Sequence, residues 1–287
     1  MIESLISREP IQKGWSGDKK FRTTDKDGNV FLLRITQKEK YESKKLEYEM
    51  MRRAAELDLP MCVPLEFGTC GEDVYSIQTW IDGTDAEDII PRLTDAKQRA
   101  YGLEAGHILR KLHSIPAPET QEAWDNRFNR KIDRNIALHE ACPLKQENAQ
   151  AFINCINKNR RLLKGRPQTF QHGDYHIGNM MIDKRGKLYI IDFNRCGFGD
   201  PWEEFNRIVW CAQKAPVFAS GIVNGYFNGD VPMDFWKLLA LYISSNTLSS
   251  LPWAVSFGEK EIAVMQNQAR DVFNWYKGMS DSVPSWY

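Results

Sequence analysis

The chain has 287 residues with 38 basic and 38 acidic side chains, so its formal net charge at pH 7 is zero. A neutral chain has no overall field that would draw it to nucleic acid or to an anionic membrane, and we expect neither partner. The sequence has no run of about 18 apolar residues that could span a bilayer, and its start lacks the apolar stretch of a signal peptide. We therefore expect a cytoplasmic protein.

The first 80 residues have a β-rich pattern. β-like runs at 19–24 and 30–36 flank a turn cluster, and runs at 65–67 and 74–80 predict a second hairpin. Ahead of the first run, two glycines bracket Trp15 and Ser16. Glycines allow a close backbone approach to phosphate, with Ser16 and the following backbone amides, such as that of Gly17, as donors and Lys19 or Lys20 as the charge. A plain hairpin turn is equally compatible with these residues.

Two charged residues of this region stand in apolar surroundings. Arg34 alternates with apolar residues in the run 31–35 and projects with Leu32 from one face of the predicted strand. Residues 39–58 predict a helix, and Glu47 lies on its apolar face. A carboxylate in that position needs a cationic partner, unless Glu47 is simply a solvated helix residue.

The rest of the chain is mainly helical in pattern. Residues 96–113 and 149–164 have helical apolar spacing, whereas the pattern of 117–150 is weak. Most of the chain beyond residue 200 is helical and aromatic, as expected of a core.

Between these helical parts, the segment 169–195 predicts a metal site. Apolar runs at 180–183 and 187–191 flank a turn that contains Gly186, which predicts an antiparallel hairpin. If Asp183 faces Lys187, Asn179 lies opposite residue 191, and cross-strand neighbours are about 5 Å apart. Asn179 and Asp192 then emerge side by side. An amide oxygen with a carboxylate suits Mg²⁺.

Asp174 precedes Asn179 by five positions, the spacing that joins catalytic base and metal ligand in kinase catalytic loops. His172 and Gly173 come just before it, Asp192 begins a segment like the kinase D-F-G, and a Gly-Asp-Pro motif centred on Asp200 follows. Through these motifs the sequence resembles the aminoglycoside phosphotransferase family of the protein-kinase-like superfamily, whose relatives include macrolide, choline and fructosamine kinases. The likeness extends more weakly over nearly the whole chain.

The resemblance implies an α+β, two-lobed protein-kinase-like fold. Residues 1–80 would form the nucleotide-binding lobe, a small antiparallel β-sheet with one helix. Residues 81–287 would form a larger, mainly α-helical lobe for catalysis and substrate binding. The implied activity moves the γ-phosphate of ATP or GTP to a hydroxyl of a small molecule, with Mg²⁺ as cofactor. Antibiotic resistance is the biological role that this family name suggests.

The resemblance also implies roles for individual residues. Asp174 would be the catalytic base, Asn179 and Asp192 the metal ligands, and His172 and Asp200 supports of the catalytic loop. The remaining expected positions belong to the nucleotide site: Ser16, Gly17, Arg34 in place of the usual lysine, Glu47 as the ion-pair partner of Arg34, and the adenine-binding hinge Gln78, Thr79, Trp80 and Ile81.

Acidic residues in the second half suggest a cationic acceptor, such as an aminoglycoside or another amine-bearing compound, with Glu203 and Glu204 as candidate contacts. Asp200 follows Asp192 by only eight positions. This interval is too short for the activation segment on which a protein kinase docks a peptide, so we expect no protein substrate.

Two alternatives remain open. His172, Asp174 and His176 alternate, so on a strand they would face one way and could bind zinc or manganese in a metal-dependent hydrolase. A nucleotide-binding kinase homologue without catalysis is the other alternative. The sequence leaves the oligomeric state, the acceptor and the choice between ATP and GTP undetermined.

Overall fold

The computed structural model describes residues 1–12 and 17–287, and Ser16, one of the predicted phosphate contacts, lies outside the described residues. The chain forms two compact units. Unit 1 comprises residues 1–89, 172–174 and 178–197, and unit 2 comprises residues 90–171, 175–177 and 198–287. The predicted catalytic aspartate and both predicted metal ligands thus belong to unit 1, although they lie far from the first 89 residues in sequence.

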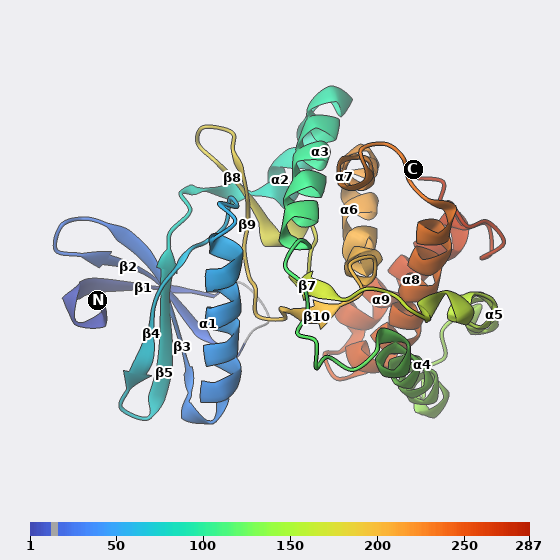
Figure 1. Cartoon of the computed structure of the whole chain (residues 1–287), viewed down its shortest axis with the longest axis horizontal. Coiled ribbons are helices and arrows are strands. Elements are labelled where there is room, and N and C mark those ends of the chain that lie inside the picture. The colour runs from blue at the N-terminus through green and yellow to red at the C-terminus, as the bar shows by residue number, and fades with distance from the viewer. Residues whose placement is uncertain (13–16) are drawn as a thin grey trace. The chain divides into compact units, whose positions relative to one another are not determined.

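Unit 1 is built on a five-stranded antiparallel sheet with the strand order β1-β2-β3-β5-β4 (Figure 1). The elements of unit 1 are β1 (Leu5–Ile11), β2 (Lys19–Asp25), β3 (Val30–Gln37), α1 (Tyr41–Ala55), β4 (Pro64–Cys70), β5 (Asp73–Thr79), β6 (Gly83–Asp85), α2 (Ala86–Ile89), β8 (Met180–Asp183) and β9 (Leu188–Ile190). The two predicted hairpins are confirmed as β2–β3 and β4–β5.

The two faces of this sheet differ in chemistry because side chains alternate along each strand. Leu33 and Ile77 are fully buried on one face, where they form an apolar cluster with Tyr75. Arg34 belongs to the opposite face, and its cross-strand partner on β2 is Lys20. This second face therefore presents two cations next to each other.

Helix α1 packs against strands β4 and β5 of the sheet. Met50, Met51 and Ala54 are buried at helical spacing, which explains why the segment forms an amphipathic helix. Lys44 and Glu47 precede Met50 on the same helix, by six and three positions. The helix thereby carries charged groups beside its apolar stripe.

The predicted hairpin of the catalytic segment is confirmed, and it lies in a second sheet with the order β6-β8-β9. Met180 pairs with Ile190, and the amide of Asp183 donates to the carbonyl of Lys187 at 3.0 Å. Gly186 has φ 83°, the positive value that the predicted turn requires. The register is the expected one, so the ends of β8 and β9 bring positions 179 and 191 together.

Unit 2 consists mostly of helices, as expected for the second part of the chain. Its elements are α3 (Asp95–Leu112), α4 (Trp124–Ala141), α5 (Ala149–Asn159), β7 (Thr169–Gln171), β10 (Gly197–Gly199, whose first residue is counted in unit 1), α6 (Ile208–Lys214), α7 (Pro216–Phe227), α8 (Met233–Val255) and α9 (Glu259–Trp275). The segment with the weak sequence pattern contains α4, whose Trp124, Phe128 and Ile132 are buried.

Helices α3 and α7 approach each other through glycines. A β-carbon at Gly106 would lie 2.2 Å from the carbonyl oxygen of Ile222, and one at Gly102 would lie 2.4 Å from that of Phe218. Gly225 meets the backbone of α3 in the same way. The close helix pair therefore depends on the absence of side chains at its contact.

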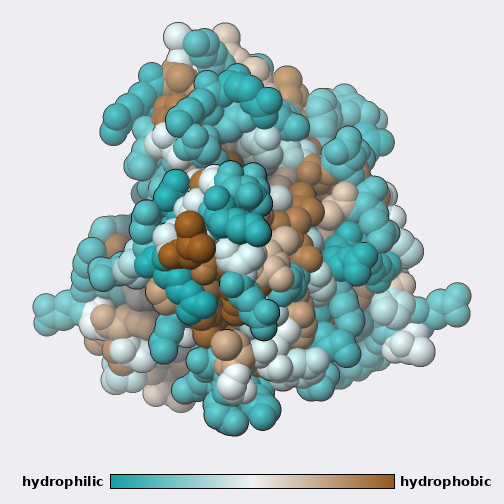
Figure 2. Space-filling view, turned by 90° about the vertical axis from the view of Figure 1, so that its left-hand side faces the viewer, coloured by the Kyte–Doolittle hydropathy of each residue, from teal (hydrophilic) through white to brown (hydrophobic). Residues whose placement is uncertain are grey.

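Figure 2 shows a largely hydrophilic face with scattered small hydrophobic spots. Across residues 1–12 and 17–287, no helix combines the length and the apolar character needed to cross a bilayer.

Candidate active site

The predicted catalytic loop begins at His172, whose side chain is fully buried. Its Nδ1 accepts a hydrogen bond from the amide of Asp174 at 3.3 Å, so its Nε2 carries the proton and donates to the carbonyl of Ile191 at 2.9 Å. One imidazole thus joins the loop of Asp174 to the residue before Asp192. His172 holds the two segments in fixed register.

Gly173 allows the chain to turn at this point. Its φ is 84°, and a β-carbon there would lie 2.0 Å from the carbonyl oxygen of Arg195. Both the backbone conformation and the space exclude a larger residue. Asp174 is therefore presented by a turn that only glycine can form.

Asn179 connects the aspartate to the hairpin. Its Nδ2 donates to the main-chain oxygen of Asp174 at 2.9 Å and lies 3.3 Å from Asp174 Oδ2. Its main-chain carbonyl oxygen accepts from the amide of Ile191 at 3.0 Å, as the predicted register requires. With the amide nitrogen bonded to Asp174, the side-chain amide oxygen of Asn179 is the atom that suits a cation.

Asp192 directly follows Ile191 and has φ 67°, an unusual left-handed conformation for a residue with a side chain. Such backbone strain persists where the surrounding structure enforces it, and it is concentrated at functional sites. Asp192 Oδ1 accepts a hydrogen bond from Arg34 Nη1 at 3.0 Å, and the side chain remains 25 % exposed. The carboxylate is held by the sheet yet stays accessible.

Arg34 lies at the centre of a charged network. Its Nε and Nη2 donate to Asp18 Oδ2 at 3.1 and 2.8 Å, and the same oxygen accepts from Lys44 Nζ at 2.8 Å. Lys44 also pairs with Glu47 at 2.8 Å. The expected direct ion pair between Arg34 and Glu47 is therefore wrong for the described residues: Glu47 pairs with Lys44 because that cation lies one helical turn away on α1.

The charges in this network shift one another's protonation. Burial raises the pKa of Asp18, but hydrogen bonds and positive charge from Lys44 and Arg34 outweigh it and hold the pKa below its usual value. Burial acts to lower the pKa of Arg34, but the negative charges of Asp192, Glu47 and Asp18 outweigh it and raise the pKa above its usual value. The guanidinium is therefore permanently charged, as arginine generally is.

Lys20 adds a third cation on the same face of the sheet. Burial is the main reason that its pKa is lowered, and the charges of Arg34 and Lys44 lower it further, while Asp192 and Asp18 act against this. The ammonium therefore lies within electrostatic range of the carboxylate predicted to bind metal.

The predicted adenine-binding hinge is only partly available. The amide of Thr79 donates to the carbonyl of Val63, and the amide of Val63 donates to Thr79 Oγ1, both at 2.9 Å. Gln78 is buried, and its Nε2 contacts Met51 Sδ at 3.7 Å. Trp80 is partly exposed, with the Arg22 guanidinium 5.8 Å from its ring centroid. The backbone of Trp80 and Ile81 is the part of the hinge that a nucleotide base could use.

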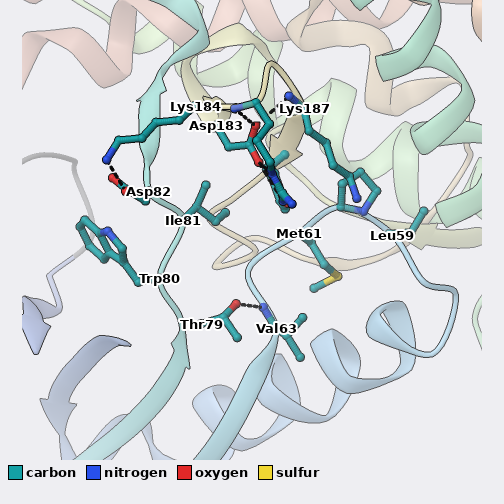
Figure 3. A pocket seen from close by; sticks show the side chains of 13 residues that line it. Leu59, Met61, Val63, Thr79, Trp80, Ile81, Asp82, Asp183, Lys184 and Lys187 are labelled. Carbon is teal, nitrogen blue, oxygen red and sulfur yellow. Dashed lines mark hydrogen bonds and ion pairs between the residues drawn. The ribbon is translucent and has the colours of Figure 1, made fainter. Parts of the chain in front are cut away.

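A pocket of about 550 Å³ lies beside this hinge (Figure 3). Thr79, Trp80 and Ile81 line it, together with residues 59–61, Val63 and the turn of the β8–β9 hairpin. Its polar lining includes the ion pair of Lys184 with Asp82 at 2.6 Å. None of the described residues around Arg34 and Asp192 contributes to its wall, so the pocket and the charged network are separate features of unit 1.

Unit 2 holds the other predicted residues. Asp200 is fully buried and accepts two hydrogen bonds from Arg166, at 2.7 and 2.8 Å, and one from the hydroxyl of Tyr242. Its carbonyl oxygen accepts from Gln171 Nε2 at 2.8 Å. These bonds tie Asp200 to the strand that leads into the catalytic loop.

The candidate acceptor contacts Glu203 and Glu204 are buried within unit 2, 9 % and 2 % exposed. Glu203 accepts from Lys131 at 2.9 Å, and Glu204 lies 3.8 Å from His113. The expectation of carboxylates open to a cationic ligand is therefore not met. The structure places both in internal pairs, where a carboxylate satisfies buried partners rather than a substrate.

The arrangement needed for a histidine-rich metal hydrolase is not found. Both ring nitrogens of His172 take part in hydrogen bonds, Nδ1 with the amide of Asp174 and Nε2 with the carbonyl of Ile191, and His176 belongs to unit 2, where its ring centroid lies 6.2 Å from that of Trp210. The part of the chain that the structure describes contains no group of three or more His, Cys, Asp or Glu residues placed to hold a metal ion.

Two residues of the network were not predicted. Lys44 lies three positions before Glu47, a spacing that signals an ion pair on a helix. Asp18 directly follows the glycine-containing segment, and its sequence context resembles an ordinary turn aspartate. Only the three-dimensional structure shows that it meets Arg34.

The predicted catalytic loop, an asparagine and an aspartate at the open end of a hairpin, and an arginine on a five-stranded sheet are the features expected of a protein-kinase-like phosphotransferase. The family model described as "Phosphotransferase enzyme family" matches residues 7–236. The chain belongs to this family and is a small-molecule kinase, as its resemblance implied.

Solved structures agree on the fold. A thermostable variant of the aminoglycoside phosphotransferase APH(4)-Ia, in complex with ADP and hygromycin B, has a TM-score of 0.67 at 15 % identity, with 95 % of each chain covered. The amicoumacin kinase hAmiN has a TM-score of 0.64 at 12 % identity, with 99 % of this chain and 91 % of that chain covered. ADP-bound APH(2'')-Ib has a TM-score of 0.64 at 15 % identity, covering 94 % and 95 %. The predicted two-lobed α+β kinase-like fold is confirmed. A sequence search of curated proteins found no match.

Proposed function

We propose that this enzyme transfers the γ-phosphate of ATP or GTP to a hydroxyl of a small, amine-bearing acceptor. The observation that carries the proposal is the hydrogen-bonded series within unit 1. Asn179 bonds to Asp174, its main-chain carbonyl bonds to Ile191, and the next residue, Asp192, bonds to Arg34. This series connects the proposed carboxylate base and the two proposed oxygen ligands of residues 174–192 to a cation on strand β3.

Asn179 and Asp192 would hold Mg²⁺, because an amide oxygen and a carboxylate with substrate phosphates suit this ion. Bound there, the ion would neutralise charge on the phosphates of the donor. The chain contributes the rigidity of the site: the left-handed backbone of Asp192 and its bond to Arg34 fix the carboxylate, while the Nδ2 bonds to Asp174 orient the Asn179 oxygen.

Residues 1–80 would form the nucleotide-binding lobe, with the rest of the chain serving catalysis and the acceptor. Gly17 and Arg34 are proposed phosphate contacts, and the backbone of Trp80 and Ile81 is proposed to bind the base. Glu47 would support Arg34 indirectly. It pairs with Lys44, which donates to the same Asp18 oxygen as Arg34 does.

Asp174 would act as the general base. Its carboxylate takes the proton of the acceptor hydroxyl while the new bond forms between the hydroxyl oxygen and the γ-phosphorus. The bond from that phosphorus to the bridging oxygen breaks, and the nucleoside diphosphate leaves. The transition state of such transfers is loose, so the protein contributes mainly position and charge. His172 and Asp200 support the loop through the bonds described above.

The amine on the acceptor is proposed from the ligands of similar structures. APH(4)-Ia was solved with hygromycin B, an APH(2'')-IIa with gentamicin, and hAmiN with its own ligand Ami. A resistance role would follow only if the acceptor is an antibiotic.

A panel of aminoglycosides, amino alcohols, macrolides and neutral sugars, each with ATP or GTP and Mg²⁺, tests the proposal through release of nucleoside diphosphate. We expect turnover with an amine-bearing member and loss of turnover in Asp192→Ala. Asp27→Asn, which changes an exposed turn residue of unit 1, is the control. Turnover with neutral acceptors alone would overturn the amine, and nucleotide binding with no turnover of any acceptor would favour the inactive homologue.

A further inference from the structure

Three cationic donors converge on a single carboxylate oxygen in unit 1. Asp18 Oδ2 accepts from Nε and Nη2 of Arg34 and from Nζ of Lys44, at 2.8 to 3.1 Å. The side chains of Asp18 and Arg34 are only 3 % and 6 % exposed. An oxygen anion with three charge-assisted donors at these distances marks a site that the fold has built for an anion.

The donors come from regular elements, whereas the acceptor does not. Arg34 lies within β3, Lys44 within α1, and Lys20 is the cross-strand neighbour of Arg34. Asp18 precedes the first residue of β2 and directly follows Gly17. The cations are therefore fixed by the fold, while their carboxylate partner sits at the end of a strand, where a change of backbone angles can move it.

The chemistry of the donors suits phosphate as well as carboxylate. A guanidinium offers paired N–H groups that match the oxygens of either anion, and an ammonium adds a point charge. A third cation, Lys20, lies within electrostatic range of Arg34 and Asp192. The carboxylates of Asp18, Asp192 and Glu47 balance these cations, so a phosphate that replaces Asp18 would keep the charge of the cluster compensated.

We propose that Asp18 occupies a phosphate subsite of the nucleotide site, and that a nucleotide must displace it in order to bind; this rests on the proposed function. A phosphoryl oxygen would take the place of Asp18 Oδ2 between Arg34 and Lys44. Exchange of one anion for another never leaves these buried cations unpaired, which avoids the large penalty of an uncompensated charge. Asp18 thereby lowers the apparent affinity of the protein for nucleotide.

The alternative role for Asp18 predicts the opposite effect. If Asp18 only orients Arg34 for nucleotide binding, loss of its charge weakens affinity. If it competes with phosphate, the apparent dissociation constant equals the intrinsic one divided by the fraction of molecules with an open subsite. A subsite that Asp18 fills nine-tenths of the time weakens binding about tenfold. The sign of the change therefore separates competitor from support.

Calorimetric titration of Asp18→Asn and Asp18→Ala with Mg·ADP, tripolyphosphate and adenosine tests the sign. We expect about tenfold tighter binding of ADP and of tripolyphosphate than in the wild type, and unchanged binding of adenosine, which has no phosphate. Asp27→Asn removes one charge from the exposed β2–β3 turn and should leave all three affinities unchanged. Equal or weaker ADP binding by both Asp18 variants overturns the proposal.

A measurement on the wild type covers the case in which the variants do not fold. Carbodiimide with an amine labels accessible carboxylates, and mass spectrometry reports each site. We expect Asp18 to be protected in the free protein and labelled more strongly when ADP and Mg²⁺ are added. Unchanged or reduced labelling on ADP binding contradicts the displacement. If the wild type and all variants bind no nucleotide, the proposed function itself fails, a pattern distinct from binding without displacement.

Discussion

Replacement of Asp174 by asparagine should separate chemistry from binding. The change keeps the size of the side chain and an oxygen that can accept from Asn179 Nδ2, which lies 3.3 Å from Asp174 Oδ2. The stronger bond, from Asn179 to the main-chain oxygen at 2.9 Å, does not involve the side chain of Asp174 at all. The position of the proposed metal ligand should therefore survive the substitution, and only the proton acceptor is lost.

The expected loss of rate is that of an enzyme without its general base. General-base catalysis contributes about 10² to 10⁴ in rate, which corresponds to about 2.7 to 5.5 kcal/mol of barrier. We expect kcat of Asp174→Asn to fall on this scale. The dissociation constant for Mg-nucleotide should change by no more than about threefold, because the residues proposed to bind nucleotide and metal are unchanged.

Single-turnover quench-flow with labelled ATP measures the chemical step, and calorimetry measures nucleotide affinity. Asp27→Asn serves as the charge-matched control. A folded Asp174→Asn protein that binds Mg-nucleotide and phosphorylates its acceptor at nearly the wild-type rate would remove Asp174 from the mechanism and refute the assignment of this loop.

Three further predictions concern the charged network. Arg34→Met should lower the free energy of unfolding in urea by about 3 to 5 kcal/mol, because it breaks the buried ion pair between Arg34 and Asp18; a loss below about 1 kcal/mol would contradict the network. Asp18 has a lowered pKa in the folded state, so its stabilising contribution is present above its unfolded-state pKa of about 3.9 and is lost as pH falls through the folded value. Acid titration should show this loss in the wild type and not in Asp18→Asn; parallel curves would argue against it. Finally, EDTA and Asp192→Ala should each abolish turnover, and full activity in EDTA would exclude the proposed Mg²⁺ requirement.

The sequence predicted the hairpin around Gly186 well because two independent signals agree there. Strand alternation has a period of two, and the glycine fixes the turn, so the pairing of residues 179 and 191 could be counted directly. The same alternation predicted the face of the strand from which Arg34 projects. Local periodicity is therefore sufficient to predict that Asn179 and Asp192 lie close together.

Pairings across the fold were not predictable in the same way. The partner of Arg34 depends on which carboxylate reaches it in space, and Asp18 arrives from the segment before β2 rather than from α1. The burial of Glu203 depends on Lys131, which lies 72 positions away in sequence. Strand β1 was missed because its sequence, LISREPI, is charged, contains proline and forms an edge with little burial.

The glycine contact between α3 and α7 has a consequence for protein engineering. Helical glycines are usual targets for stabilisation, since alanine has a helix propensity more favourable by about 1 kcal/mol. At Gly102, Gly106 and Gly225 the gain is reversed, because the added methyl group would overlap backbone atoms of the facing helix. Libraries aimed at a heat-resistant form of this kinase should keep these positions fixed and search exposed turns instead. At Gly71 a new β-carbon would meet nothing within 4 Å, but φ of 61° there favours glycine, so steric freedom alone is not a sufficient guide to mutable sites.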